Sequence, residues 1–518
     1  METLAKTPTL KARLKGRRAG VLLHPTSLGG TPACGGFGRE AAAWISALAH
    51  HGLSAWQVLP LAPTDPSGSP YNAPSASAIS TRFLDGESLR TAGLIAEDTL
   101  HRLPGAHQAV EPQLDGNLAD ARSAHLGQAL LQRYRQGLIS GTQMEDFAAW
   151  RREQGAWLED HCLYLVIKGF QKGRPWWQWS RPLAQHRPDA LARIRRVAAD
   201  AVDQEALLQW QLDRQWGHLL GRAQSKGITV IGDMPFYVAH DSSDVWGHTH
   251  LFSVYGDGSL REQSGVPPDY FSATGQLWGT PTFAWDRHRQ EGFRWWRERI
   301  RRQLRLAHVL RIDHFRALES YWAVPGQDQD ARGGCWRQSP GAAMLRQWRE
   351  AFQDLPLIAE DLGVITPAVE ALRDDFHLPG MKILQFAFDG NANNPYLPHT
   401  YGSDNHAVFT GTHDNATSVG WWANLNAEDR RRVEAYLGYP VTAPGWQLLR
   451  LALMSPAALV MTPLQDLMGL GDEARMNRPG TTTGNWSWRI PVPLEQLDGH
   501  LLGYGAMAAL YGRGAATA

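Results

Sequence analysis

The sequence has few cysteines, no long apolar run and no excess of charge of either sign. Three of its 518 residues are cysteine, and this odd, widely spaced set fits neither a disulfide framework nor a metal-ligand motif. The sequence contains no run of about 18 apolar residues that could span a membrane, and no apolar segment near the start resembles a secretory leader. We therefore expect a soluble, cytoplasmic protein with reduced thiols.

Charge and aromatic content both favour a neutral substrate. Lys plus Arg and Asp plus Glu each number 51, for a formal net charge of +0, so neither a nucleic acid nor a membrane surface is an expected partner. Trp occurs 22 times, more often than Phe at 15 or Tyr at 13. Flat aromatic faces pack well on sugar rings, although Trp is also ordinary core material, so this composition points only weakly to carbohydrate.

Eight short apolar runs read as buried strands, most of them followed by a helical pattern. They occupy residues 20–23, 56–60, 228–235, 309–313, 355–359, 381–386, 406–409 and 457–463. No Gly-x-Gly-x-x-Gly motif follows the first run, and no internal repeat is present. This order predicts an α/β fold, a (β/α)₈ TIM barrel, in preference to an open doubly wound sheet.

The barrel is expected to form one catalytic domain over residues 19–510 with two insertions. The first, at about 64–203, carries helical patterns, because a structureless loop of that length is implausible. The second, at about 238–286, is irregular. Residues 1–18, which include a basic run, and residues 511–518 are expected to be tails. The Arg-rich segment 297–305 has helical spacing and is expected to be a solvated amphipathic helix.

Acidic residues follow several of the predicted strands. Asp233, Asp313, Glu360 and Asp414 all stand at the carboxyl end of a run. In a barrel these ends meet on one face and build the active site, so the four side chains should converge on one cleft. Each residue alone could equally be a helix cap or a solvated loop residue. Their equivalent positions favour a shared site.

The segment 309–318, Val-Leu-Arg-Ile-Asp-His-Phe-Arg-Ala-Leu, places charge where a buried strand should end. Side chains alternate along a strand, so Arg311 and Asp313 share one face while Ile312 packs on the other. An adjacent Arg should lower the pKa of Asp313 and keep it ionised, as a nucleophile requires. A structural ion pair that caps the strand would fit the same residues.

Two carboxyl groups in different protonation states can cleave a glycosidic bond. Glu360 lies among like charges, Asp361 in sequence and Asp414 in space, which should raise its pKa and suit it as the acid. Asp313 would then attack the anomeric carbon. Asp414, preceded by His413, could bond the sugar hydroxyls more strongly as the ring flattens in the transition state.

Four ordered segments resemble the signature regions of the α-amylase clan. They are Gly-Asp-Met-Pro-Phe-Tyr-Val (232–238), Leu-Arg-Ile-Asp-His-Phe-Arg (310–316), Ile-Ala-Glu-Asp-Leu-Gly (358–363) and Gly-Thr-His-Asp-Asn (411–415). Flanking motifs are similar to those of the 4-α-glucanotransferase family, also called amylomaltase or disproportionating enzyme, which is glycoside hydrolase family 77. These motifs include Ser-Pro-Tyr-Asn (69–72), Gly-Val-Pro-Pro-Asp-Tyr-Phe (265–271) and Glu-Ala-Arg-Met-Asn-Arg-Pro-Gly (473–480).

This resemblance implies roles for individual residues. Asp313 would be the nucleophile, Glu360 the acid/base and Asp414 the transition-state stabiliser. Residues implied to position the nucleophile or bind substrate are Arg311, Asp233, His413, Tyr71, His314, Asn415, Trp278 and Asp269, the last two in a loop over 265–279 that covers the cleft. No metal or cofactor is implied, and the family lacks a carboxyl-terminal β-sandwich. Two positions depart from the pattern: Ala416 and Ala273 stand where many members carry an acidic residue.

The function predicted from the sequence is transfer of α-1,4-glucan segments by a retaining double displacement. Donors would be maltooligosaccharides, amylose, or glucans derived from starch or glycogen, and the acceptor would be the 4-hydroxyl of a glucan or of glucose. Three alternatives remain open at this point: a retaining α-amylase-type hydrolase, a Schiff-base aldolase that uses Lys382, and an inert glucan-binding protein. The sequence makes no prediction about oligomeric state.

Overall fold

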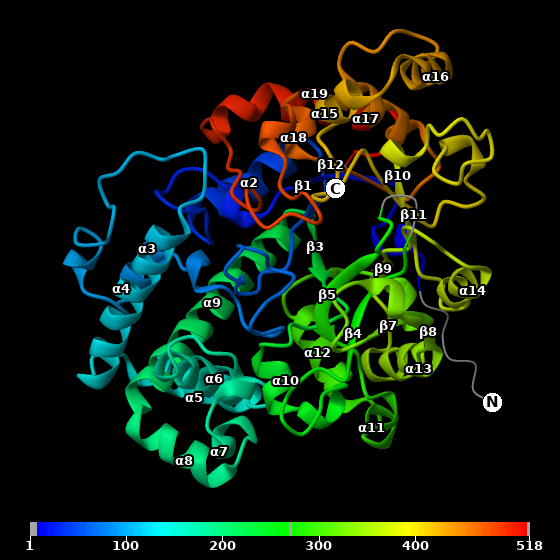
Figure 1. The fold of residues 1–518 in the computed structure, drawn as a ribbon. Helices are drawn as coiled ribbons and strands as arrows, with labels where there is room; N and C mark the ends of the chain where they lie inside the picture. The colour runs from blue at the N-terminus through cyan, green and yellow to red at the C-terminus, as the bar shows by residue number, and fades with distance from the viewer. Residues whose placement is uncertain (1–7, 269–271, 515–518) are drawn as a thin grey trace.

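The computed structural model describes residues 8–268 and 272–514, and its centre is a closed barrel of eight parallel strands (Figure 1). Around the barrel the order is β1-β12-β11-β10-β9-β6-β3-β2. The strands are β1 (Arg18–Leu22), β2 (Ala55–Gln57), β3 (Thr229–Met234), β6 (Val309–Ile312), β9 (Leu357–Ala359), β10 (Gly380–Ile383), β11 (His406–Phe409) and β12 (Leu459–Pro463). Each overlaps one of the eight predicted runs, which confirms the predicted (β/α)₈ barrel.

Side-chain alternation along each strand separates the barrel interior from the surrounding helices. Ile231, Val309 and Met381 belong to one buried cluster inside the barrel, whereas Leu310 and Ile312 pack in the larger core shared with the helices. The helices that follow the strands or cover the barrel are α2 (Arg39–His50), α9 (Ala199–Ser225), α12 (Arg294–Leu304), α13 (Gly341–Phe352), α14 (Pro367–Asp375), α15 (Ser418–Asn424), α16 (Ala427–Leu437), α17 (Pro444–Met454) and α19 (Asp498–Leu510).

The amino-terminal segment differs from the predicted tail. Leu10–Arg13 forms a short helix, α1, and Leu10 and Leu14 are 1% and 5% exposed because they join the cluster inside the barrel. The amide of Leu10 donates to Asn405 Oδ1 (3.1 Å), just before β11, and Arg13 pairs with Asp354, just before β9. The segment therefore closes the amino-terminal end of the barrel, opposite the strand ends that carry the acidic residues.

The first insertion is built from helices that lie beside the barrel (cyan to green in Figure 1). They are α3 (Gly86–Thr91), α4 (Gly116–Arg135), α5 (Gly141–Glu153), α6 (Leu158–Phe170), α7 (Arg181–Ala184) and α8 (Pro188–Val197). Their starts follow ordinary capping chemistry: the Asp115 side chain accepts the amide of Leu118, and Ser140 with Gln143 forms a capping box. The long helix α9 then leads back to β3.

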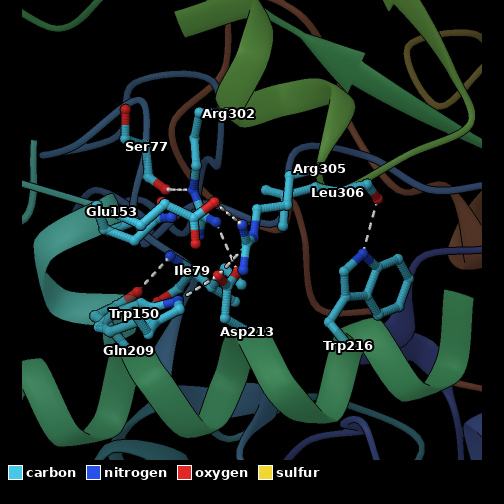
Figure 2. Close-up of polar contacts among 12 residues, drawn as sticks. Ser77, Ile79, Trp150, Glu153, Gln209, Asp213, Trp216, Arg302, Arg305 and Leu306 are labelled. Atoms are coloured by element: carbon cyan, nitrogen blue, oxygen red, sulfur yellow. Dashed lines mark hydrogen bonds and ion pairs between the residues drawn. The ribbon is translucent and has the colours of Figure 1, made fainter. Parts of the chain in front are cut away.

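A buried ion pair joins two helices of the barrel, α9 and α12, and it corrects part of the prediction for the Arg-rich helix. Arg302 on α12 pairs with Asp213 on α9 at 2.6 Å, and both side chains are 3% exposed (Figure 2). The indole of Trp150 donates to the same carboxylate at 2.7 Å. Arg299, also buried, donates to the carbonyl of Phe236. The expectation of a solvated Arg-rich face holds for Arg301 and Arg305, which are exposed. It fails for Arg299 and Arg302, whose guanidinium groups have buried acceptors that spacing along one helix cannot reveal.

The second insertion was expected to be irregular, but part of it belongs to an antiparallel sheet. The strand order in this sheet is β5-β4-β7-β8. The strands are β4 (Glu262–Val266), β5 (Gln276–Pro281), β7 (Ser320–Pro325) and β8 (Cys335–Gln338). The strands β4 and β5 follow β3, whereas β7 and β8 follow β6, so the sheet lies at the carboxyl end of the barrel strands (Figure 1). The sequence did not predict these strands. Gly or several polar residues interrupt β4, β5 and β8, whereas β7 (Ser-Tyr-Trp-Ala-Val-Pro) is an apolar run that was missed.

The chain after the last barrel strand returns toward the strand ends before it reaches α19. It runs through α18 (Leu464–Leu467) and the loop that contains Arg475, Asn477 and Trp486. No β-sandwich follows the barrel within the described residues. None of the helices in the described part of the chain is long and apolar enough to cross a membrane.

Candidate active site

The ends of β3 and β6 place two carboxylates on one buried cation. The strand register sets Asp233 beside Arg311, and Arg311 Nη1 donates to both oxygens of Asp233 at 2.7 and 2.8 Å. Its Nη2 lies 2.9 Å from Asp313 Oδ1. Asp233 is fully buried, whereas the side chain of Asp313 is 31% exposed and faces the cleft. Arg311 and Asp313 therefore share one face of the strand end, as side-chain alternation predicts.

The protonation of Asp313 differs from the expectation. Loss of solvent raises the pKa of Asp313 to about 6, and the carboxylates of Asp233 and Asp414 act in the same direction. Arg311 lowers this pKa but does not outweigh the other effects. The prediction of a lowered pKa was wrong, because burial, together with the carboxylates of Asp233 and Asp414, raises the pKa of Asp313 by more than Arg311 lowers it.

Glu360 is held against the same loop. It follows β9, and its Oε2 accepts the backbone amide of His314 at 2.6 Å, one residue after Asp313. His314 has a left-handed backbone (φ 52°) where the chain enters the 3-10 helix Phe315–Leu318. Burial raises the pKa of Glu360 well above its ordinary value, and Asp313 and Asp361 reinforce the rise against Arg311 and the amide. The direction agrees with the prediction, but burial and Asp313 are its main causes, not Asp414.

Asp414 lies in the loop after β11 and is fixed by a late segment of the chain. Its Oδ1 accepts from Asn477 Nδ2 at 2.6 Å and lies 3.3 Å from His413 Nε2. Its backbone carbonyl accepts from Arg475 Nη2 at 2.5 Å. Sequence reasoning did not single out Arg475 or Asn477. The family motif at 473–480 contains both residues and could have indicated them.

Three neighbouring aromatic rings form one wall beside these carboxylates. The ring of Tyr71 lies parallel to that of His413, with centroids 5.1 Å apart and planes at 11°. Trp486 lies 5.7 Å from Tyr71 and 5.9 Å from His413. The Tyr71 hydroxyl donates to Asp233 Oδ2 at 2.8 Å, which ties the wall to the buried ion pair. Trp486 was not among the predicted site residues.

A second aromatic group lies on the side of Glu360. Trp278 on β5 meets the ring of His314 edge to face at 4.9 Å and 88°, and Tyr237 is 5.9 Å from Trp278. Loss of solvent lowers the pKa of His314 to about 3, and Arg316 adds to the effect, so the ring is neutral at pH 7. Between the two walls, the cleft offers apolar ring faces together with acidic and amide groups.

Asn415 and Ala416 belong to the loop that follows β11. The side chain of Asn415 accepts the amide (2.9 Å) and hydroxyl (2.8 Å) of Thr412, so it shapes the loop that carries His413 and Asp414. Ala416 offers its carbonyl to Gln385 Nε2 at 2.9 Å. Asp269 lies outside the described residues.

Lys382 does not reach the carboxylates. It lies between Met381 and Ile383, which point into the barrel, and its Nζ is 5.7 and 5.9 Å from the rings of Tyr396 and Tyr401. Its side chain therefore projects toward the outer layer of the barrel, because neighbours on a strand alternate. This geometry removes the basis for a Schiff-base aldolase at the cleft.

A barrel whose strand ends bring together Asp313, beside Arg311, and Glu360, with its raised pKa, has the two carboxyl groups that enzymes acting on glycosidic bonds use. The model of the 4-α-glucanotransferase family matches residues 23–495. The chain is 42% identical to the 4-α-glucanotransferase of Synechocystis over 507 residues, 96% of this chain and 98% of that protein. It is also 42% identical to the 4-α-glucanotransferase of Thermus thermophilus over 501 residues, 95% and 98% of the two chains.

A solved structure agrees with these sequence matches. The amylomaltase from Streptococcus agalactiae in complex with acarbose superimposes with a TM-score of 0.91 at 32% identity, covering 96% of this chain and all of that chain. The protein described here belongs to the 4-α-glucanotransferase family.

Proposed function

We propose that this protein transfers α-1,4-glucan segments from a donor chain to the 4-hydroxyl of an acceptor glucan or glucose, through a covalent glucosyl-enzyme. The observation that carries the proposal is the unequal carboxyl pair. Glu360 holds its proton well above the ordinary pH range of a carboxylic acid, whereas Asp313, bound by Arg311, loses its proton at about pH 6. Donors are maltooligosaccharides, amylose and the glucans of starch or glycogen.

In the first half-reaction, Asp313 and Glu360 act on the same glycosidic bond. A carboxylate oxygen of Asp313 attacks the anomeric carbon, and the bond from that carbon to the glycosidic oxygen breaks. Glu360 gives its proton to the departing oxygen, so the leaving segment carries a free 4-hydroxyl. The products are a glycosyl ester on Asp313 and an ionised Glu360.

In the second half-reaction, an acceptor replaces the segment that left. Ionised Glu360 removes the proton of the acceptor 4-hydroxyl, whose oxygen attacks the anomeric carbon and releases Asp313. Two inversions restore the original α configuration. Water in place of the acceptor would give hydrolysis with the same stereochemistry, so access to the ester decides between the two outcomes.

The two walls have different tasks in this scheme. Tyr71, His413 and Asp233 surround the glucose unit that becomes linked to Asp313. Asp414, fixed by Asn477, bonds its hydroxyls as the ring flattens toward an oxocarbenium ion. On the side of Glu360, Trp278 offers a ring to the acceptor. This apolar side favours a sugar over water.

The three free cysteines fit a cytoplasmic location for this chemistry. Cys34 and Cys162 are buried and unpaired, and Cys335 is exposed and unpaired. Proteins of reducing compartments typically keep such thiols.

Incubation with maltotriose tests the proposed function. We expect glucose together with maltopentaose and longer products, while the number of reducing ends stays constant, because each transfer breaks one glycosidic bond and forms another. Chromatography of the products and a reducing-sugar assay measure the two quantities. Rising reducing ends without elongation would show the retaining hydrolase, and an inert wild type would favour the glucan-binding alternative.

The pH profile should show the unusual acidity of Asp313. The reaction needs Asp313 ionised and Glu360 protonated, so kcat/KM should rise with pH and level off above about 6. It should fall again only as Glu360 loses its proton at higher pH. Measuring kcat/KM for maltotriose from about pH 4 to about pH 9 checks this prediction. An acid limb near 3.8, the usual Asp value, would contradict it.

A further inference from the structure

An exposed tryptophan lies in the antiparallel sheet at the strand ends of the barrel. Trp336, on the edge strand β8, is 41% exposed, although tryptophan is usually well buried. The strand register pairs it with Trp322 of β7, so both rings lie on one face of the sheet, with centroids 5.2 Å apart at 67°. This face is not part of the site described above.

A buried cation holds the ring of Trp336 in place. The guanidinium of Arg316 lies 3.8 Å from the ring centroid, and Arg316 is only 5% exposed. The same guanidinium donates to the carbonyl of Val364 and to Ser320 Oγ (3.4 Å), while its Nε has no partner among the described residues. One face of the indole is therefore occupied by a cation–π contact, and the exposed part of the ring is presented in a fixed orientation.

These contacts connect Trp336 to the acid/base side of the cleft. Arg316 follows His314, whose amide binds Glu360, by two residues. Val364 follows Glu360 by four residues and is 63% exposed. No contact links Trp336 to the opposite wall of Tyr71 and His413 within the described residues. Through Arg316, the ring of Trp336 is therefore linked to the chain segments that follow Asp313 and Glu360.

The proposed mechanism indicates which part of a bound glucan lies on the side of Glu360. Because Glu360 protonates the departing oxygen and later activates the incoming hydroxyl, the leaving segment and the acceptor both extend from its side of the cleft. We propose that Trp336 is a stacking platform for a remote glucose unit of α-1,4-glucan acceptors, beyond the unit that reacts. This inference rests on the function proposed above and adds a residue that selects acceptors by length.

The chemistry of the platform suits a neutral polymer. A glucose unit presents an apolar C–H face to an indole, and such contacts with aromatic rings need no charge on the ligand. Because Arg316 and Trp322 already hold the ring, little conformational freedom is lost when a sugar stacks on it. A single glucose acceptor, bound next to Glu360, is too short to use a remote platform.

Three variants test this inference: Trp336→Ala, Trp336→Phe, which keeps a ring, and the control Phe170→Ala. Phe170 is 58% exposed and ends helix α6 in the helical insertion. With one donor, kcat/KM is measured for maltohexaose and for glucose as acceptors. We expect the ratio of the two values to fall about fivefold to tenfold in Trp336→Ala, mainly through KM for maltohexaose. The ratio should stay within about twofold of wild type in Trp336→Phe and in the control.

Other outcomes overturn the inference. An unchanged ratio in Trp336→Ala would show that the ring only covers Arg316. An equal loss with both acceptors would show a structural role, since glucose turnover in the same preparation reports the integrity of the site. A wild type that elongates no acceptor would instead refute the proposed function, and this inference would fall with it.

Discussion

Replacement of Asp313 by Asn is expected to lower kcat for transfer from maltotriose about 10⁴-fold or more, while maltoheptaose still binds. An amide of the same shape cannot form the glycosyl ester, so the first half-reaction has no nucleophile. Binding should survive because Asp233 continues to neutralise Arg311 through two hydrogen bonds, and the walls of Tyr71 and His413 do not depend on the replaced group. Transfer assays and isothermal titration calorimetry measure the two properties.

A matched control separates this effect from a general response to losing a carboxylate. Asp286 on α11 (Trp285–Gln290) is 90% exposed, and its one ion pair among the described residues is with Arg289 of its own helix, so Asp286→Asn should behave like wild type. If Asp313→Asn kept more than a tenth of the wild-type kcat, or if it lost glucan binding together with activity, the nucleophile would have to be another group.

Replacement of Glu360 by Gln should lower transfer from maltotriose about 10³-fold, because neither the departing oxygen nor the incoming hydroxyl can then exchange its proton with the enzyme. An α-maltosyl fluoride donor separates the two half-reactions. Fluoride leaves without a proton, so Asp313 should still be glycosylated, whereas attack of the acceptor stays slow without a base. The variant should therefore accumulate a covalent maltosyl-enzyme.

The accumulated species is detectable by mass spectrometry of the intact protein. Wild type, which turns the ester over, should show little of it under the same conditions. Glu360→Gln without any burst of released fluoride would mean that the residue has a structural role, since the first half-reaction needs only Asp313 when the leaving group is fluoride.

The barrel and its site were predictable because both depend on local order in the sequence. Short apolar runs specify buried parallel strands, and alternation places Arg311 and Asp313 together whatever the neighbouring strand is. The positions after the strands then converge because parallel strand ends share one face. The same alternation, read in the structure, directs Lys382 away from the cleft.

Features that depend on distant partners could not be predicted in this way. The strands β4, β5 and β8 are rich in Gly or polar residues, and the pairing of β4 with β7 joins segments that flank β6. The burial of Arg302 requires Asp213 from α9, and the pKa of Asp313 depends on Asp233 from β3. Each of these features depends on which distant segments of the chain pack together. An isolated stretch of sequence does not contain that information.

Identifying the residue that carries the glycosyl group tests the central claim most directly. Glu360→Gln is incubated with α-maltosyl fluoride, digested at low pH, and its peptides are mapped by tandem mass spectrometry. We predict one maltosyl ester, on Asp313, in the peptide that spans the end of β6. An ester on Asp233 or Asp414, or release of fluoride without any covalent adduct, would contradict a double displacement through Asp313.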